Sequence, residues 1–570
     1  PARPGRSLDR AAAIGPTGKR SLLQARSYEM ATLMQPNVHE TGVHETGVHE
    51  TEVYETGARG TGAVAAGDRE TAAAAGAVLR DGGNAFDAAL AGLFVACIAE
   101  PVLCSLAGGG FLLGQTGNGA ARLYDFFCQT PGLRLPADDL EFMPVHVDFG
   151  ASRQEFHIGM GAMAVPGLIA GAFAIHRDLC TLPMTRLVEP AVTLARRGLP
   201  LAPLQSFILE AVAPIFQWSA ESRALYNSTA APERTLRRGE MLALPALADL
   251  LEALAREGED LFYRGEVGQA IAAANREHGG AISLSDLAGY EVVRRAPLTR
   301  QFRGIEILGN PAPASGGSLL AFTLALLEHS EMNADRDHFV NLAHAMTLTD
   351  QAREAVGLNH GCDDGCENKA AATLLSEPFM ADYRHEMVGR AGKTGGTTHI
   401  SVVDAKGNAA ALTVSNGEGC GHILGPGSIM LNNMLGEEDL NPNGFFQWQP
   451  NSRITSMMSP TLVRWKDGRV LALGSGGSNR IRSAILQVLI NHLCLGQSLG
   501  EAVAAPRIHM EQGMLHIEAG HRAETIAHLG ERFPNQQIWP DRNFFFGGAH
   551  GVSFEPNGEP NSDAFSAAGD

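Results

Sequence analysis

Residues 395–416 read GGTTHISVVDAKGNAAALTVSN, two glycines followed by alternating apolar and polar residues on both sides of Lys406–Gly407. The alternation predicts a β-hairpin that turns at this dipeptide. Paired glycines leave the peptide bond before Thr397 unhindered. A Thr hydroxyl becomes a nucleophile when its own freed α-amine acts as the base. Cleavage between Gly396 and Thr397 would leave pieces of 396 and 174 residues. An ordinary glycine turn before a β-branched strand is the alternative.

Tight turns would set the register of this hairpin and of a second one. With Ala405 opposite Asn408, Ser415 falls opposite Thr398 and diagonal to Thr397. The second hairpin, SPTLVRWKDGRVLALGSGG at 459–477, turns at Asp467–Gly468. Pairing Lys466 with Arg469 places Gly474 opposite Thr461, which brings residues 456–459 and the glycine loop 474–479 together.

The glycine loop precedes a helix whose apolar face runs from Ile481 to His492. Unpaired amides just before a helix amino terminus can bind a developing oxyanion. An ordinary strand-to-helix turn is the alternative explanation of this loop.

Composition excludes two classes of partner. The chain has 570 residues, 44 Lys and Arg against 62 Asp and Glu, and a net charge of −18. An acidic surface repels phosphate backbones, so we expect no nucleic-acid partner. No run of about 18 apolar residues is present, so we expect no membrane span. The absence of a visible signal peptide favours the cytoplasm, although a start at Pro1 leaves a periplasmic or secreted location open.

The amino-terminal region differs from the rest. Residues 38–57 repeat VHETG with no apolar face, which predicts a disordered tail over 1–61. From Gly62 we expect a strand, helices over 68–80 and up to about 99, and a hairpin over 108–126. The region 165–395 is mainly helical in pattern, interrupted by a loop at 310–317.

Metal and nucleotide motifs are incomplete. Cys362 and Cys366 form a CxxxC pair without a second pair. The segment GRAGKT at 389–394 ends like a P-loop but has Met387 where the first glycine belongs. We therefore expect neither a metal ion nor a cofactor.

Eight segments taken together resemble the γ-glutamyltransferase (γ-glutamyltranspeptidase) family. They are DGGNAFDAALA at 81–91, AGGGFLL at 107–113, AVPGLIAG at 164–171, GGAISLSDLAGYE at 279–291, PAPASGG at 311–317, TTHISVVDAKGNA at 397–409, LNN at 431–433 and MSPT at 458–461. The resemblance extends over about residues 62–560.

The resemblance implies an α+β fold, the four-layer αββα sandwich of amino-terminal nucleophile (Ntn) hydrolases. It implies self-cleavage into a large subunit, 62–396, and a small catalytic subunit, 397–570. Thr397 would attack a γ-glutamyl amide such as glutathione and pass the acyl group to water, an amino acid or a peptide, without a cofactor. The second hydroxyl falls on Ser415, and the oxyanion donors fall on Gly476 and Gly477, with a one-residue ambiguity that includes Ser478.

The substrate contacts of the family are altered in this sequence. Where the family has a carboxylate-binding arginine after Asp-Phe, this chain has Phe127 and then Cys128. The other positions that the resemblance assigns to substrate are Ser456, Met457 in place of a second serine, Asn416 beside Gly417, and Glu437 or Glu438 for the α-amine. Arg453 or Arg480 are candidates to replace the missing guanidinium.

Two further functions remain open. One is an acylase or amidohydrolase of the same family, acting on glutaryl-type or other acyl amides. The other is a catalytically silent protein that binds a small molecule in the same cavity. Intact Gly396, Thr397 and Ser415 favour an enzyme, because a binding cavity alone needs none of them together.

Overall fold

The structure is a computed structural model. It describes residues 61–117, 119–148, 153–332, 337–358, 366–383, 396–441, 444–511, 513–556 and 564–570. The predicted tail up to residue 60, Cys362, the segment 389–394 and Gly395 lie outside the described residues.

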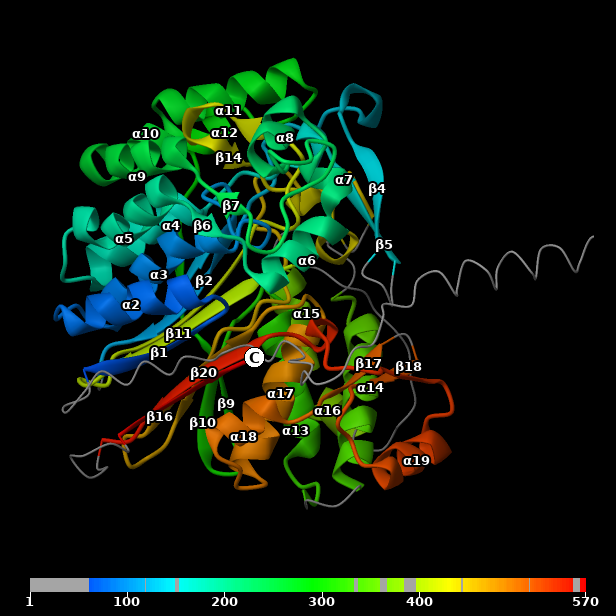
Figure 1. Cartoon of the computed structure of the whole chain (residues 1–570). Coiled ribbons are helices and arrows are strands. Elements are labelled where there is room, and N and C mark those ends of the chain that lie inside the picture. Colours follow the sequence, from blue (N-terminus) through cyan, green and yellow to red (C-terminus); the bar gives the residue numbers. More distant parts are fainter. Residues whose placement is uncertain are drawn as a thin grey trace, which may run out of the picture. The chain divides into compact units, whose positions relative to one another are not determined.

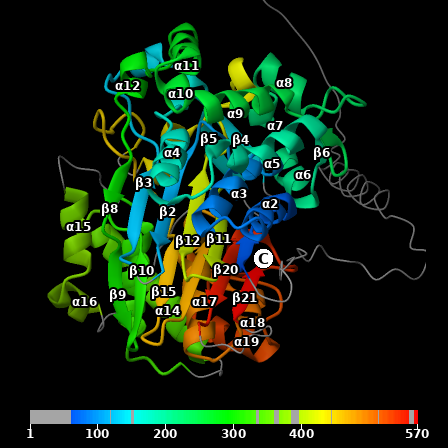
Figure 2. The same cartoon turned by 90° about the vertical axis from the view of Figure 1, so that its left-hand side faces the viewer.

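The first sheet has six strands, and each pairs antiparallel with its neighbours in the order β1-β11-β12-β2-β3-β8. Their bounds are β1 Gly62–Ala66, β2 Gly109–Gln115, β3 Arg122–Phe126, β8 Val293–Arg295, β11 Thr398–Asp404 and β12 Ala409–Ser415. The hairpin that follows Thr397 therefore lies inside the sheet, and all residues of β11 and β12 are buried (Figure 2).

The second sheet also has six antiparallel strands, in the order β21-β20-β16-β15-β10-β9. Their bounds are β9 Leu298–Phe302, β10 Ile305–Gly309, β15 Thr461–Arg464, β16 Val470–Ser475, β20 Ala549–Phe554 and β21 Phe565–Gly569. Strand β11 contacts β16 and β20, and β12 contacts β16, so the two sheets pack against each other.

Helices contact both sheets (Figure 1). Those against the first sheet are α2 Arg69–Arg80, α3 Ala85–Ala99 and α4 Leu168–Leu179. Those against the second are α13 Gly316–Leu327, α17 Arg480–Leu493 and α18 Leu499–Ala504. The predicted helices at 68–80, up to 99 and from 481 are confirmed, as is the hairpin over 108–126.

Further helices surround these elements. They are α5 Met184–Arg197, α6 Pro203–Ala211, α7 Ala213–Phe216, α8 Ala220–Tyr226, α9 Pro245–Glu257, α10 Asp260–Tyr263, α11 Glu266–Glu277, α12 Leu284–Ala288, α14 Asp337–Ala355, α15 Cys366–Leu374, α16 Glu377–Tyr383 and α19 Ala523–Arg532. Among the helices of the described part of the chain, none has the length and hydropathy to cross a bilayer.

Short strands complete the list. They are β4 Met143–Asp148, β5 Arg153–Ile158, β6 Leu199–Pro200, β7 Met241–Leu242, β13 Ile423–Leu424, β14 Ile429–Met430, β17 Ile508–Glu511, β18 Met514–Ile517 and β19 Gln536–Ile538. The sequence reading missed β8, β9 and β10, which lie in the region expected to be mainly helical. Strand β9 alternates between exposed and less exposed residues at the edge of its sheet, a weak apolar pattern over only five residues.

Both hairpin registers differ from prediction by one residue. Thr398 pairs with Val414 rather than Ser415, which puts Ser415 level with Thr397 itself. Thr461 pairs with Leu473 rather than Gly474. Each turn has three loop residues instead of two and ends in a glycine with positive φ, +75° at Gly407 and +92° at Gly468. Such a turn adds one residue to the loop and shifts the whole ladder by one.

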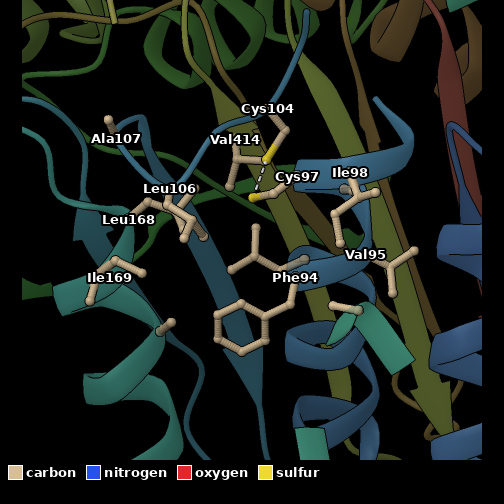
Figure 3. Close-up of a cluster of buried hydrophobic side chains, with 14 of the residues drawn as sticks. Phe94, Val95, Cys97, Ile98, Cys104, Leu106, Ala107, Leu168, Ile169 and Val414 are labelled. Atoms are coloured by element: carbon tan, nitrogen blue, oxygen red, sulfur yellow. Dashed lines mark hydrogen bonds between the residues drawn. The ribbon is translucent and has the colours of Figure 1, made fainter. Parts of the chain in front are cut away.

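Helix α3 is the most buried of the three helices that contact the first sheet. All 15 of its residues are buried, so it has no polar face and lies wholly in the core. Near its end Cys97 and Cys104 lie 3.4 Å apart between their sulfur atoms, beside Val414 of β12 and Leu106 (Figure 3). This apolar cluster therefore supports the strand that ends in Ser415.

Candidate active site

The peptide between Gly396 and Thr397 lies at the start of β11, beside the end of β12. The Ser415 hydroxyl donates a hydrogen bond of 2.7 Å to the carbonyl oxygen of Gly396 and accepts one of 3.0 Å from the Gly417 amide. Thr397 is half-buried. A hydroxyl that donates to a carbonyl oxygen polarises it, so this arrangement activates the carbonyl next to Thr397.

The glycine loop after β16 reaches the same place. A Cβ built on Gly476 would overlap the carbonyl oxygen of Thr397, so only glycine allows this approach of the two sheets. The Gly476 amide, however, donates to the Gly548 carbonyl at 3.1 Å. Among the described residues the backbone amides of Gly477 and Ser478 have no hydrogen-bond acceptor. Helix α17 begins two residues after Ser478, at Arg480. The Gly476 amide, expected as an oxyanion donor, is therefore already occupied, whereas the Gly477 and Ser478 amides have no acceptor within the described part of the chain.

The buried carboxyl group of Asp439 holds this loop through hydrogen bonds with two of its side chains. The Ser478 hydroxyl donates to Asp439 at 2.6 Å, and the Asn479 amide donates to Asp439 and Glu511, both at 3.3 Å. Burial raises the pKa of Asp439, whereas its hydrogen bond from Ser478 lowers it. These contacts are made to side chains of the loop and do not use the backbone amides of Gly477 and Ser478.

Two buried carboxyl groups, Glu418 and Glu437, lie near the end of β12, and Glu418 contacts Gly396. Glu418 accepts a 2.7 Å hydrogen bond from the Gly396 amide, and its own amide donates to Asn433 at 3.0 Å. Burial raises the pKa of Glu418 to about 7 and the pKa of Glu437 well above its usual range, the latter also because Glu418 is close. Two ionised carboxyl groups in one buried site repel each other, which favours a proton on one of them. Of Glu437 and Glu438, Glu437 is the one that packs against Gly417.

A third buried carboxyl group holds the residue after Thr397. Glu100, at the end of α3, accepts hydrogen bonds from Thr398 at 2.5 Å and Thr71 at 3.0 Å. Burial, and then the charge of Asp68, raises its pKa to about 8. Thr398 is the first residue of β11. Its hydrogen bond to Glu100 therefore ties the start of this strand, next to Thr397, to the end of α3.

We predict that Glu100→Gln reduces the loss of stability at alkaline pH. The pKa of Glu100 in the folded state, about 8, lies above the ordinary value of 4.5. The contribution of Glu100 to the free energy of unfolding is therefore fully present below pH 4.5 and is lost as the pH rises toward 8. Gln cannot ionise and keeps an oxygen that accepts from a Thr hydroxyl. Thermal unfolding at pH 5, 7 and 9 should show the midpoint of the variant rising relative to wild type as pH increases. The exposed Glu524→Gln is the matched control, and a constant difference for Glu100→Gln would refute the prediction.

The remaining predicted substrate residues are only partly gathered here. Asn416 is fully buried, and neither atom of its side-chain amide has a hydrogen-bond partner among the residues that the structure describes. Ser456 and Met457 instead pack on the loop before α13: the Ser456 carbonyl accepts from the Ser315 and Gly316 amides, and its hydroxyl accepts from Met458. Among the described residues, no hydrogen bond joins Ser456 or Met457 to Thr397.

The candidate replacement arginines are already engaged. The Arg453 side chain is 7% exposed, and its guanidinium lies on Asp125 at 3.3 Å, on the Glu291 carbonyl at 2.7 Å, and on Phe127 and Tyr290. Arg480 is 1% exposed, donates to the Phe545 carbonyl at 2.9 Å and lies over the Phe545 ring.

Phe127 itself is buried and stacks on Phe111. An aromatic ring, Phe127, thus stands at the position where the family has its carboxylate-binding arginine. Arg453 and Arg480 are bound to other groups of this chain.

Sequence reasoning missed Glu418, Asp439 and Glu100. One signal was available for Glu100: it directly follows the apolar helix Ala85–Ala99, where an acid must be buried and therefore needs partners. Glu418 stands alone in the glycine-rich stretch SNGEGCG, in a segment that is otherwise buried. Among the described residues no group of three or more His, Cys, Asp or Glu has the arrangement of a metal site.

Comparison with known proteins points to one family. The sequence model of the family described as gamma-glutamyltranspeptidase matches residues 71–570. The acylase ACY 1 proenzyme of Pseudomonas sp. (strain V22) is 31% identical over 513 residues, which cover 85% of this chain and 89% of that protein. The glutathione hydrolase proenzyme of Escherichia coli (strain K12) is 30% identical over 484 residues, 79% of this chain and 81% of that protein.

A solved structure agrees on the fold. The crystal structure of a cephalosporin acylase from Bacillus halodurans superposes with a TM-score of 0.76, covering 94% of this chain and 99% of that one at 20% sequence identity. At this identity the likeness concerns the fold alone.

Proposed function

Because this chain belongs to the gamma-glutamyltranspeptidase family, an enzyme family, we propose that it cleaves itself between Gly396 and Thr397 and then acts as an acyl-transfer enzyme. Residues 62–396 form the large subunit and 397–570 the small one. We assign the two facing sheets and their helices to the αββα arrangement of Ntn hydrolases. The proenzyme names of the two relatives support a precursor that is cut.

The observation that carries this proposal is the hydrogen bond from Ser415 to the Gly396 carbonyl oxygen. In self-cleavage the Thr397 hydroxyl oxygen attacks the Gly396 carbonyl carbon, and its proton passes to the departing Thr397 nitrogen. The C–N bond breaks and an ester forms. Water then hydrolyses the ester to a Gly396 carboxylate and a Thr397 with free hydroxyl and amine.

Turnover repeats this chemistry on a separate molecule. The Thr397 amine takes the proton of its own hydroxyl, and the oxygen attacks the acyl carbonyl. The Gly477 and Ser478 amides stabilise the oxyanion. The protonated leaving amine departs, an acyl ester remains on Thr397, and water, an amino acid or a peptide takes the acyl group.

The acyl group we propose is γ-glutamyl, as in glutathione. Glu437, the carboxyl group packed against Gly417, is the partner of the substrate α-ammonium, and Asn416 offers a buried amide that has no partner in the described part of the chain. A bound ammonium would draw the pKa of Glu437 back down and pair with its charged form.

A second candidate is an acylase that accepts acyl groups without the α-amino acid pattern. The aromatic Phe127 in the core, and the engagement of Arg453 and Arg480 elsewhere, favour it because neither of these two guanidinium groups is available to a γ-glutamyl carboxylate. The similarity to the acylase proenzyme supports the same alternative.

Two measurements test these proposals. Intact mass and amino-terminal sequencing should find a fragment that begins at Thr397. γ-Glutamyl p-nitroanilide and glutaryl p-nitroanilide differ in the α-amine but share the leaving group. We expect a kcat/KM at least about tenfold higher for the γ-glutamyl compound, the value of one charge-assisted hydrogen bond.

The opposite preference would replace the γ-glutamyl assignment by the acylase. A cut chain that turns over neither compound but binds one would support a silent binding protein.

A further inference from the structure

Gly396 is held at both of its polar backbone groups by one short segment after β12. Ser415 donates to its carbonyl oxygen, and Glu418, three residues later, accepts from its amide, each at 2.7 Å. Gly396 is the residue whose carbonyl carbon becomes the acyl group of the first ester. We infer that Glu418 is a positioning residue for self-cleavage: it fixes the Gly396 peptide so that its carbonyl faces Ser415 and Thr397. This inference rests on the proposed function.

Two contacts are needed because Gly396 is a glycine. Without a Cβ the residue samples more backbone conformations than any other, and confining one residue costs about 1–2 kcal/mol. One hydrogen bond to the carbonyl leaves the other dihedral angle free. A second bond to the amide of the same residue orients the carbonyl carbon toward the attacking oxygen, and such alignment contributes much of the rate of an intramolecular reaction.

Glu418 is itself rigidly placed. Its side chain is 3% exposed, its amide is bonded to Asn433, and its carboxyl group faces Glu437. Its second carboxyl oxygen has no hydrogen-bond donor among the described residues. Keeping an acidic group there opposes folding. The buried Glu418 makes a hydrogen bond with the Gly396 amide, and we take this contact as the reason for an acidic group at this position.

The same group also favours release of the cut end. Hydrolysis of the ester converts the neutral Gly396 carbonyl into a carboxylate next to Glu418 and Glu437. Like charges in a buried site repel strongly. The new carboxyl terminus is therefore expected to leave, which clears the space in front of Thr397 for a substrate.

Two substitutions in the full chain separate positioning from charge. Glu418→Gln keeps an oxygen that accepts from the Gly396 amide, whereas Glu418→Ala removes it. The uncut fraction of freshly purified protein, followed by intact mass over time, gives the cleavage rate. We expect Glu418→Gln to cut within about threefold of wild type and Glu418→Ala to cut about 100-fold more slowly, the cost of a misplaced reacting group.

Thermal unfolding shows whether each variant is folded. If Glu418→Ala does not fold, Glu418→Asp replaces it, because Asp keeps the charge but is shorter by one methylene and should also slow cleavage. The inference is overturned if Glu418→Ala or Glu418→Asp cuts at the wild-type rate, or if Glu418→Gln is as slow as Glu418→Ala. An uncut wild-type chain overturns the proposed function together with this inference.

Discussion

Thr397→Ala should remain a single chain and lose turnover by about 10⁶-fold, the scale seen when a nucleophile is removed from a catalytic group that acts as a unit. The variant lacks the oxygen that attacks the Gly396 carbonyl, so no ester forms and no α-amine is freed. It keeps the Ser415 and Glu418 contacts, which are made to Gly396. Intact mass should give one species in place of the 396- and 174-residue pieces.

Thr397→Ser is the matched control. It retains the hydroxyl and loses only a methyl group, so the chain should still be cut before residue 397. Cleavage of Thr397→Ala at the same bond would show that another group attacks the Gly396 carbonyl. The role given to Thr397 would then be wrong.

Gly476→Ala should slow both cleavage and turnover by about 100-fold. Its Cβ would overlap the Thr397 carbonyl oxygen, so the loop after β16 or the start of β11 must move. A displacement of about 1 Å at a reacting group costs about this factor. Overpacking of the buried contact should also reduce stability by about 1–3 kcal/mol. The cleavage rate by intact mass and the unfolding free energy in denaturant measure the two effects.

Gly500→Ala provides the comparison. Gly500 lies in α18, where an added Cβ would meet nothing within 4 Å. Ala is favoured over Gly in a helix by about 1 kcal/mol, so this variant should be at least as stable as wild type and cut normally. Equal cleavage rates for the two glycine variants would mean that Gly476 does not constrain Thr397.

Much of the fold was predictable because its signals are local. The alternation around Lys406–Gly407 and Asp467–Gly468 predicted two hairpins, and both form. A second helix was predicted up to about residue 99, and α3 ends at Ala99. Strands β9 and β10 were missed because a short edge strand and its neighbour carry little pattern of their own and are recognised through their pairing with β15.

The sequence named candidate residues for the site, but it did not predict how they pair. Ser415 was expected one position from where it lies, because the turn residue count depends on the positive φ of Gly407. Gly476 was expected to donate to an oxyanion, but its amide is used by Gly548, a residue more than seventy positions away.

The sequence by itself determined the candidates for the chemistry: a Thr after two glycines, a second hydroxyl at the end of the returning strand, and a glycine loop before a helix. These follow from periodicity and turn chemistry within about twenty residues. Only the tertiary structure decided that Glu418 holds Gly396, that Glu437 rather than Glu438 packs against Gly417, and that Arg453 is bonded to Asp125. Such choices depend on which buried groups lack a partner once distant segments meet, and a local pattern does not record that.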